Sequence, residues 1–266
     1  MRVIDIHTHF FPDNIAKASI DFLEKEADIK AYSDGTIASM RKYMKEDGVD
    51  ICVNQPVATK KEQVMSINRK MIEFNKTNKD VITFGAMHPD FYLTGDVAEE
   101  MEFIAKNGIK GIKLHPEYQD FFPDEERVKG IYEACRKNNL IILFHAGIDF
   151  AYDREVRATP ERLKQVTTIN GLKLIFAHFG SYKMYDGVLK HLAGTSAYFD
   201  TAYTADMDLK DAAAIIKSHG PDKIVFGTDF PWERASNVRK NIENAVTDKT
   251  SLEKIFHENA EKLLSI

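Results

Sequence analysis

The chain has 266 residues, with 36 Lys+Arg against 41 Asp+Glu, so its formal net charge at pH 7 is −5. This mildly acidic balance, without a basic block, argues against a nucleic-acid partner, because such proteins need cationic side chains that neutralise phosphates. The chain is 44% hydrophobic and 29% charged and has no apolar run long enough to cross a bilayer, which excludes the membrane and disordered classes.

Short apolar segments rich in β-branched residues recur about every 30 residues, the length of one βαβ unit. They are apolar almost throughout rather than alternating, which is typical of a parallel sheet covered on both faces. They predict eight strands, over Val3–Ile6, Asp50–Asn54, Val81–Ala86, Ile109–Leu114, Leu140–Phe144, Lys173–Ala177, Ser196–Asp200 and Lys223–Gly227.

Segments with the apolar period of a helix lie between these strands. They predict helices over Lys60–Asn78, Asp96–Asn107, Asp124–Lys137, Thr159–Ile169, Tyr182–Leu192 and Leu209–Ser218. The long connection after the first strand predicts two extra helices, Asn14–Lys25 and Thr36–Glu46, and the tail predicts a last one, Ser251–Leu264.

Eight strands that alternate with helices over this length predict an α/β fold of the (β/α)₈ TIM-barrel type. The main rival is an open doubly wound sheet, but the chain has neither a GxGxxG nor a GKS/GKT loop for a nucleotide. No repeat, low-complexity segment or linker interrupts the chain, so we expect residues 1–266 to form a single domain.

Residues able to bind a metal stand at the carboxyl ends of the predicted strands, where the catalytic groups of a barrel converge. They are His7, His9, His115, His145, His178 and Asp229. His7 and His9 are two residues apart on an extended strand, so their side chains point to the same side and can share one cation. Neutral nitrogens together with one carboxylate suit Zn²⁺ or another first-row divalent ion. The alternative is a set of core histidines that hydrogen-bond to the backbone.

Five segments carry a family resemblance: Asp5–His9, Gly111–Pro116, Phe144–Gly147, Ala177–Gly180 and Gly227–Pro231. Together they resemble the amidohydrolase superfamily. They are most similar to its branch of TIM-barrel metal-dependent hydrolases that includes aminocarboxymuconate-semialdehyde decarboxylase and the resorcylate decarboxylases. The closing segment Glu258–Leu263 resembles the Asn-Ala ending of that branch. These motifs are specific for the superfamily and not for a substrate.

The resemblance implies one divalent metal ion, with zinc favoured, held by His7, His9, His145 and Asp229. It also implies that His178 lies beside the metal as an acid/base or carbonyl polariser, and that Asp229 takes the proton of the attacking water. Binuclear members of the superfamily hold a second ion through a carboxylated lysine at the end of strand four, and Lys113 lies near that place. We favour Lys113 as a charge beside the metal over this carbamate role.

Other candidates have two interpretations each. His115 either contacts the metal surroundings or substrate, or has a structural role beside Pro116. Arg154 and Arg157, in the loop after strand five, could clamp a substrate carboxylate or lie in solvent. Tyr118 and Trp232 either line the pocket or pack at its rim. The remaining helical histidines, His191, His219 and His257, are expected at the surface.

The main functional hypothesis is a metal-dependent hydrolase that uses metal-activated water on a small carbonyl compound: an amide, lactone or ester, with or without a carboxylate. The alternative is a metal-dependent non-oxidative decarboxylase of a small carboxylic acid. A third hypothesis is a barrel that binds without catalysis. The small number of arginines near the predicted pocket favours hydrolysis.

We expect a small-molecule substrate as partner, with no nucleic acid and no membrane. A homodimer through the exterior helices is an open option. The charged start of the chain lacks the apolar stretch of a signal peptide, and the two cysteines show no CxxC spacing, so we expect a cytoplasmic protein.

Overall fold

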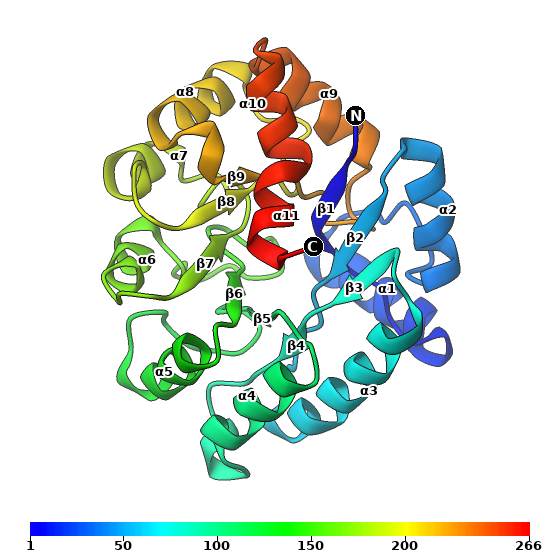
Figure 1. Cartoon of the computed structure of the whole chain (residues 1–266), viewed down its shortest axis with the longest axis vertical. Helices are drawn as coiled ribbons and strands as arrows, with labels where there is room; N and C mark the ends of the chain where they lie inside the picture. The colour runs from blue at the N-terminus through cyan, green and yellow to red at the C-terminus, as the bar shows by residue number, and fades with distance from the viewer.

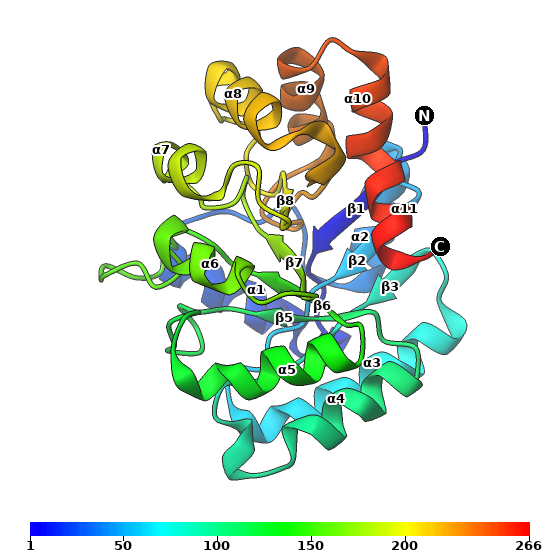
Figure 2. The same cartoon turned by 60° about the vertical axis from the view of Figure 1, so that its left-hand side comes forward.

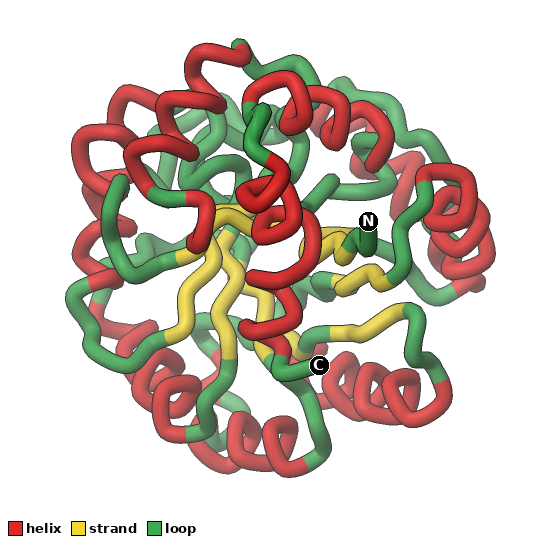
Figure 3. The backbone as a smooth tube through the Cα atoms, turned by 45° about the horizontal axis from the view of Figure 1, so that its top comes forward, coloured by secondary structure: helices red, strands yellow, loops and turns green.

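Nine short parallel strands form the wall of a barrel at the centre of the molecule (Figures 1 and 3). In the computed structural model, which describes residues 1–266, they are β1 Ile4–Thr8, β2 Ile51–Asn54, β3 Val81–Thr83, β4 Gly85–Ala86, β5 Gly111–Leu114, β6 Ile141–Phe144, β7 Lys173–Phe176, β8 Tyr198–Asp200 and β9 Ile224–Val225. Because β3 and β4 are one predicted strand interrupted at Phe84, all eight predicted strands are present.

The strands fall into two hydrogen-bonded groups, in the orders β1-β2-β3 and β4-β5-β6-β7-β8-β9. At one seam, Phe84 N donates to Asn54 O of β2 at 3.0 Å. At the other, Ile6 N of β1 donates to Phe226 O at 2.8 Å, just after β9. These bonds join the two groups at both seams, so the predicted TIM barrel is confirmed.

Helices surround the strands, as Figure 3 shows in red. They are α1 Asp13–Ala27, α2 Ile37–Asp47, α3 Val64–Thr77, α4 Val97–Lys106, α5 Lys129–Lys137, α6 Pro160–Thr167, α7 Tyr185–Gly187, α8 Leu209–His219, α9 Ala235–Ala245, α10 Lys249–Glu253 and α11 Asn259–Leu264. The two extra helices after β1 and the helical tail are therefore present. Helix α9 is not among the helices predicted from the sequence, and α7 continues as a π-helical turn, Val188–Leu192.

The side chains of each strand alternate between two hydrophobic clusters. In β6, Ile142 and Phe144 pack outwards in a cluster of 51 buried residues that the helices cover. Ile141 and Leu143 point the other way, into a cluster of 13 buried residues inside the barrel. This separation is the reason why strands buried on both faces are apolar at successive positions.

Helix α11 closes the end of the barrel where the strands begin. Its Leu263 and Leu264 belong to the interior cluster, and Asn259 Nδ2 donates to Pro221 O and Ile224 O, both at 2.7 Å. Figure 2 shows β1 pointing away from α11 and towards the side where α1 lies. The end with the strand tips is therefore the one left for a site. None of the helices is both long and apolar enough to span a lipid bilayer.

Candidate metal centre

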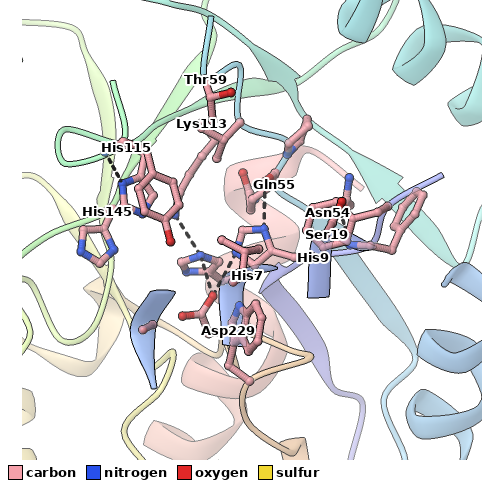
Figure 4. Close-up of a pocket in the computed structure, with 18 of the residues that line it drawn as sticks. His7, His9, Ser19, Asn54, Gln55, Thr59, Lys113, His115, His145 and Asp229 are labelled. Carbon is pink, nitrogen blue, oxygen red and sulfur yellow. Dashed lines mark hydrogen bonds and ion pairs between the residues drawn. The ribbon is translucent and has the colours of Figure 1, made fainter. Parts of the chain in front are cut away.

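His7 projects from β1 and His9 from the position just after it, beside Asp229, which follows β9 (Figure 4). The two imidazole rings are 5.2 Å apart, so they share a side as their spacing predicts. Asp229 Oδ1 lies 3.0 Å from His9 Nε2 and 3.4 Å from His7 Nε2. One ligand atom from each of the three residues therefore lies within 4.8 Å of the other two. We call His7, His9 and Asp229 the imidazole–carboxylate cluster.

A buried carboxyl group fixes β1 against the strand that closes the barrel. Asp5 Oδ1 accepts hydrogen bonds from His7 N at 3.1 Å and from Thr228 N at 3.0 Å, and Asp5 Oδ2 accepts one from Thr228 Oγ1 at 2.6 Å. Burial raises the pKa of Asp5 to about 8. Since Thr228 immediately precedes Asp229, these bonds set the position of both strands that carry the cluster.

The hydrogen bonds of the two imidazoles determine which nitrogen faces the cluster. His7 Nδ1 donates to Asp200 Oδ2 at 2.8 Å, and His9 Nδ1 donates to Gln55 O at 3.0 Å. In each neutral ring the hydrogen is then on Nδ1, and Nε2 offers a lone pair. Burial and the neighbouring Lys113 lower the pKa of His7 to about 4, so this ring is neutral at pH 7.

These lone pairs make the cluster suitable for a cation. Two imidazole nitrogens and a carboxylate oxygen face one another at hydrogen-bonding distances, an arrangement that needs a positive charge among them. Burial acts to raise the pKa of Asp229, but the neighbouring imidazoles of His7 and His9 outweigh burial and hold this pKa well below its usual range. The carboxylate is therefore ionised, as a metal ligand must be.

Lys113 is the cationic side chain nearest to the cluster. It projects inwards from β5, is almost completely buried, and its Nζ lies 2.9 Å from His7 Nε2. Burial lowers the pKa of Lys113 to about 8. The structure thus places Lys113 directly beside the predicted metal position.

His178 reaches the site because its backbone leaves the strand conformation. At the end of β7 Phe176 packs outwards, and the next residue, Ala177, packs inwards, so a continuing strand would point the side chain after it away from the barrel interior. His178 instead has φ of 60°, in the left-handed region, which turns it inwards. Its ring lies 5.6 Å from that of His7.

A hydrogen-bonded chain links His178 to His145. Because Ala202 O can only accept, His178 Nδ1 donates to it, at 2.8 Å. In a neutral His178 ring, Nε2 then accepts from His145 Nδ1 at 3.2 Å. The remaining nitrogen, His145 Nε2, keeps its lone pair and is buried without a hydrogen-bond partner. A buried acceptor of this kind fits a cation.

The structure places His145 in a second group, next to the imidazole–carboxylate cluster. The rings of His115 and His145 are stacked 4.2 Å apart with 10° between their planes. Asp149 Oδ2 lies 3.5 Å from His115 Nε2 and 3.8 Å from His145 Nε2. Three of the four predicted ligands thus come together, while the fourth, His145, belongs to the second group and hydrogen-bonds to His178.

Arg154 and Arg157, for which the sequence left open a carboxylate clamp or a place in solvent, pair with protein carboxylates. Arg154 Nε donates to Glu117 Oε2 at 3.3 Å, and the backbone N–H of Arg157 donates to Glu117 Oε1 at 2.7 Å. Asp120 pairs with both arginines. Neither Arg154 nor Arg157 lines the cavity above the cluster.

This cavity has a volume of about 790 Å³ and opens from the strand tips. Tyr118 and Trp232 line it, as do Lys113 and His115. Half of its 34 lining residues are hydrophobic. It is the space in which a substrate can meet the cluster.

Two acidic residues of the site, Asp200 and Asp149, are not among the predicted site residues. Asp200 is the last residue of β8, so the strand-end rule that found the histidines could also have found it. Asp149 lies in the loop after β6, where no periodic signal marks it.

A barrel with an imidazole–carboxylate cluster at its strand tips has the architecture of a TIM-barrel enzyme. The chain belongs to the amidohydrolase family, whose sequence profile matches residues 4–266. The predicted family resemblance is thereby confirmed. No curated protein sequence matches the chain.

Solved structures share this fold at low sequence identity. An uncharacterised TIM-barrel protein from Bordetella bronchiseptica has a TM-score of 0.77 at 16% identity, over 100% of this chain and 99% of the other. The 5-carboxyvanillate decarboxylase from Novosphingobium aromaticivorans, complexed with manganese and 4-hydroxy-3-methoxy-5-nitrobenzoic acid, has a TM-score of 0.72 at 15% identity, over 100% and 96%. The 2,6-dihydroxybenzoate decarboxylase from Rhizobium has a TM-score of 0.72 at 13% identity, over 100% and 99%.

Proposed function

We propose that this protein is a metal-dependent, non-oxidative decarboxylase of a small carboxylic acid. The observation that carries the proposal is the buried Lys113 Nζ, 2.9 Å from His7 Nε2, at the floor of a half-hydrophobic cavity. A cation at this position can compensate the charge of a substrate carboxylate that loses its hydration in the cavity. The fold shared with two decarboxylases also supports the proposal.

His7, His9 and Asp229 would hold the metal ion, with His145 as the fourth ligand. A divalent cation bound there would supply Lewis-acid polarisation of the substrate's oxygens. Zinc suits the nitrogen-rich donor set, and the manganese in the Novosphingobium decarboxylase makes manganese the second ion to test.

The protein's own residues would act on the carboxylate and on the proton. Lys113 binds a carboxylate oxygen and orients the bond to be broken. That C–C bond breaks, its electron pair stays on the substrate carbon, and CO₂ leaves. The carbon then takes up a proton from Nε2 of a protonated His178, the neutral ring accepts from His145 Nδ1 again, and solvent replaces the proton. The reaction consumes one proton and needs no oxidant.

Hydrolysis is the second candidate, and one observation favours it. No arginine lines the cavity. Lys70 and Lys113 are its only lysines, so they are the cationic side chains that could meet an acidic substrate there. In a hydrolase, Asp229 would take the proton of the attacking water, and Nε2 of a protonated His178 would donate a hydrogen bond to the carbonyl oxygen.

The two candidates give different products from the protein as purified. We would incubate it in D₂O with a panel of carboxylic acids, esters, lactones and amides, and follow the products by NMR and released CO₂ with a bicarbonate assay. The proposal expects CO₂ and a product with deuterium on the carbon that bore the carboxyl group. Acid released from an ester, lactone or amide without CO₂ would establish the hydrolase instead.

A further inference from the structure

The cavity is much larger than the reacting group alone requires. Its volume of about 790 Å³ lies in the range, about 300 to 1,000 Å³, of cavities that enclose drug-sized ligands. The imidazole–carboxylate cluster and Lys113 occupy only its floor, and the same cavity extends to residues of α1 and α3. We call the part between these two helices the α1–α3 cleft.

One face of α1 forms an apolar wall of this cleft. The apolar residues Ile15, Ala18 and Phe22 recur at the three- and four-residue spacing of a single helix face, with the small Ser19 among them, and all four line the cavity. The side chains of Ile15 and Phe22 are 45% and 61% exposed. The helix attaches to the protein through other residues, Ala16 and Ile20, which are buried. Packing within the chain therefore does not explain the apolar face.

The charged residues of α1 all lie outside this wall. The helix carries Asp13, Lys17, Asp21, Glu24, Lys25 and Glu26, and none of them lines the cavity. On the facing helix, α3, Ile67 and Met71 add apolar surface, and Lys70 is exposed. Because α1 offers the cleft no charged side chain and Lys70 of α3 is exposed to solvent, the part of the cleft beside α1 favours an uncharged apolar group.

We propose that the substrate is a carboxylic acid with an apolar chain or ring extension that lies in the α1–α3 cleft. Continuity of the cleft with the cluster makes the occupant a substrate rather than a partner protein. The placement of the substrate's carboxyl group at Lys113 and the cluster depends on the proposed function. The placement of its apolar group in the cleft depends only on the apolar face of α1.

Binding of a homologous series tests this inference without requiring turnover. Butanoate, hexanoate and octanoate are added to the protein as purified, and binding is followed through Trp232, the only tryptophan, which lines the cavity. If each added methylene is buried in the cleft, the dissociation constant falls about fourfold per methylene. A constant that does not change with chain length would overturn the inference.

The variant Ile15→Ser/Phe22→Ser removes the apolar wall at two exposed positions, so its fold should persist. We expect less than about half of the wild-type gain in affinity per methylene, with butanoate affinity unchanged. The matched control is Tyr92→Ser, which removes an aromatic side chain of similar exposure, 54%, outside the cavity. It should keep the full gain, and an unchanged gain in the double variant would refute the assignment.

The outcomes also separate this inference from the proposed function. Release of CO₂ without any dependence of affinity on chain length would refute the α1–α3 cleft as a substrate site and leave the decarboxylase standing. A wall-dependent gain in a protein that releases no CO₂ would refute the decarboxylase and support the cleft.

Discussion

Asp200 Oδ2 lies 2.8 Å from His7 Nδ1, and both side chains are buried. The other oxygen, Asp200 Oδ1, accepts the backbone N–H of His178 at 2.8 Å. One carboxylate therefore fixes the tautomer of a candidate metal ligand and the backbone of the candidate acid. Burial acts to raise the pKa of Asp200, but its interaction and hydrogen bond with His7 outweigh burial, so the net pKa is lowered and the group is ionised.

Asp200→Asn should weaken metal binding about 10- to 100-fold, as loss of such supporting carboxylates typically does. An amide can donate to His7 Nδ1, which moves the ring hydrogen to Nε2 and removes the lone pair from the cluster. Competition with a chromophoric chelator measures the affinity. The control Asp206→Asn changes an exposed aspartate and should bind metal as the wild type does. Equal affinities in the two variants would contradict this role of Asp200.

Replacing the two linked histidines should separate binding from chemistry. His145→Ala should lower metal occupancy, because it removes the buried Nε2 that has no protein partner. His178→Ala should abolish turnover and leave the metal bound, since both of its ring nitrogens are engaged by protein atoms. Metal content and product formation are measured on the same preparations. The reverse pattern would exchange the two assignments.

Gly147→Ala should destabilise the fold by at least about 2 kcal/mol. Gly147 has φ of 88°, and an added Cβ would lie 2.1 Å from Tyr182 N and 2.5 Å from Tyr182 O. The clash would displace the loop that follows His145. Gly130→Ala is the control, because nothing lies within 4 Å of its added Cβ. Urea denaturation compares the free energies of unfolding, and similar values for both variants would contradict the close approach.

His219 should make the fold less stable in acid. Its Nε2 donates to Ala197 O at 2.9 Å and its Nδ1 accepts from Gly194 N at 3.2 Å, so the neutral ring satisfies both bonds. Burial lowers its pKa from 6.5 to about 4. Below pH 6.5 the unfolded chain binds a proton that the folded chain does not, so this stability is present above pH 6.5 and is lost as the pH falls towards 4.

The expected loss from this one group between pH 7.5 and 5 is about 2 kcal/mol. Denaturant unfolding at the two pH values measures it against His219→Gln, which cannot take up the proton. The variant should be less stable at pH 7.5, because it lacks the stacking of His219 on Phe199, but its stability should depend less on pH. The same pH dependence in both proteins would contradict the assignment.

Much of the barrel and of its site follows from local patterns. The two-residue periodicity places His7 beside His9, and it places Lys113, His115 and His145 on the inner face of their strands. The three- and four-residue spacing of helices is also present in a helix that was not predicted. Ala235, Val238 and Ile242 recur at helical spacing in α9, and this face is buried.

Other features depend on tertiary structure. The inward turn of His178 requires a left-handed residue, which strand periodicity alone does not predict. The prediction that His219 lies at the surface was wrong, because its ring stacks 3.7 Å from that of Phe199. Arg154 and Arg157 form ion pairs with Glu117 and Asp120, which precede them by more than 30 residues. The sequence of the loop after β6 therefore could not reveal these partners.

Elemental analysis of the protein purified without chelators tests the imidazole–carboxylate cluster most directly. The account predicts about one equivalent of a divalent metal per chain, lost when His9→Ala removes a ligand. Two equivalents, reduced to one by Lys113→Met, would assign Lys113 the carbamate role instead. No bound metal, even after zinc or manganese is supplied, would contradict the metal centre.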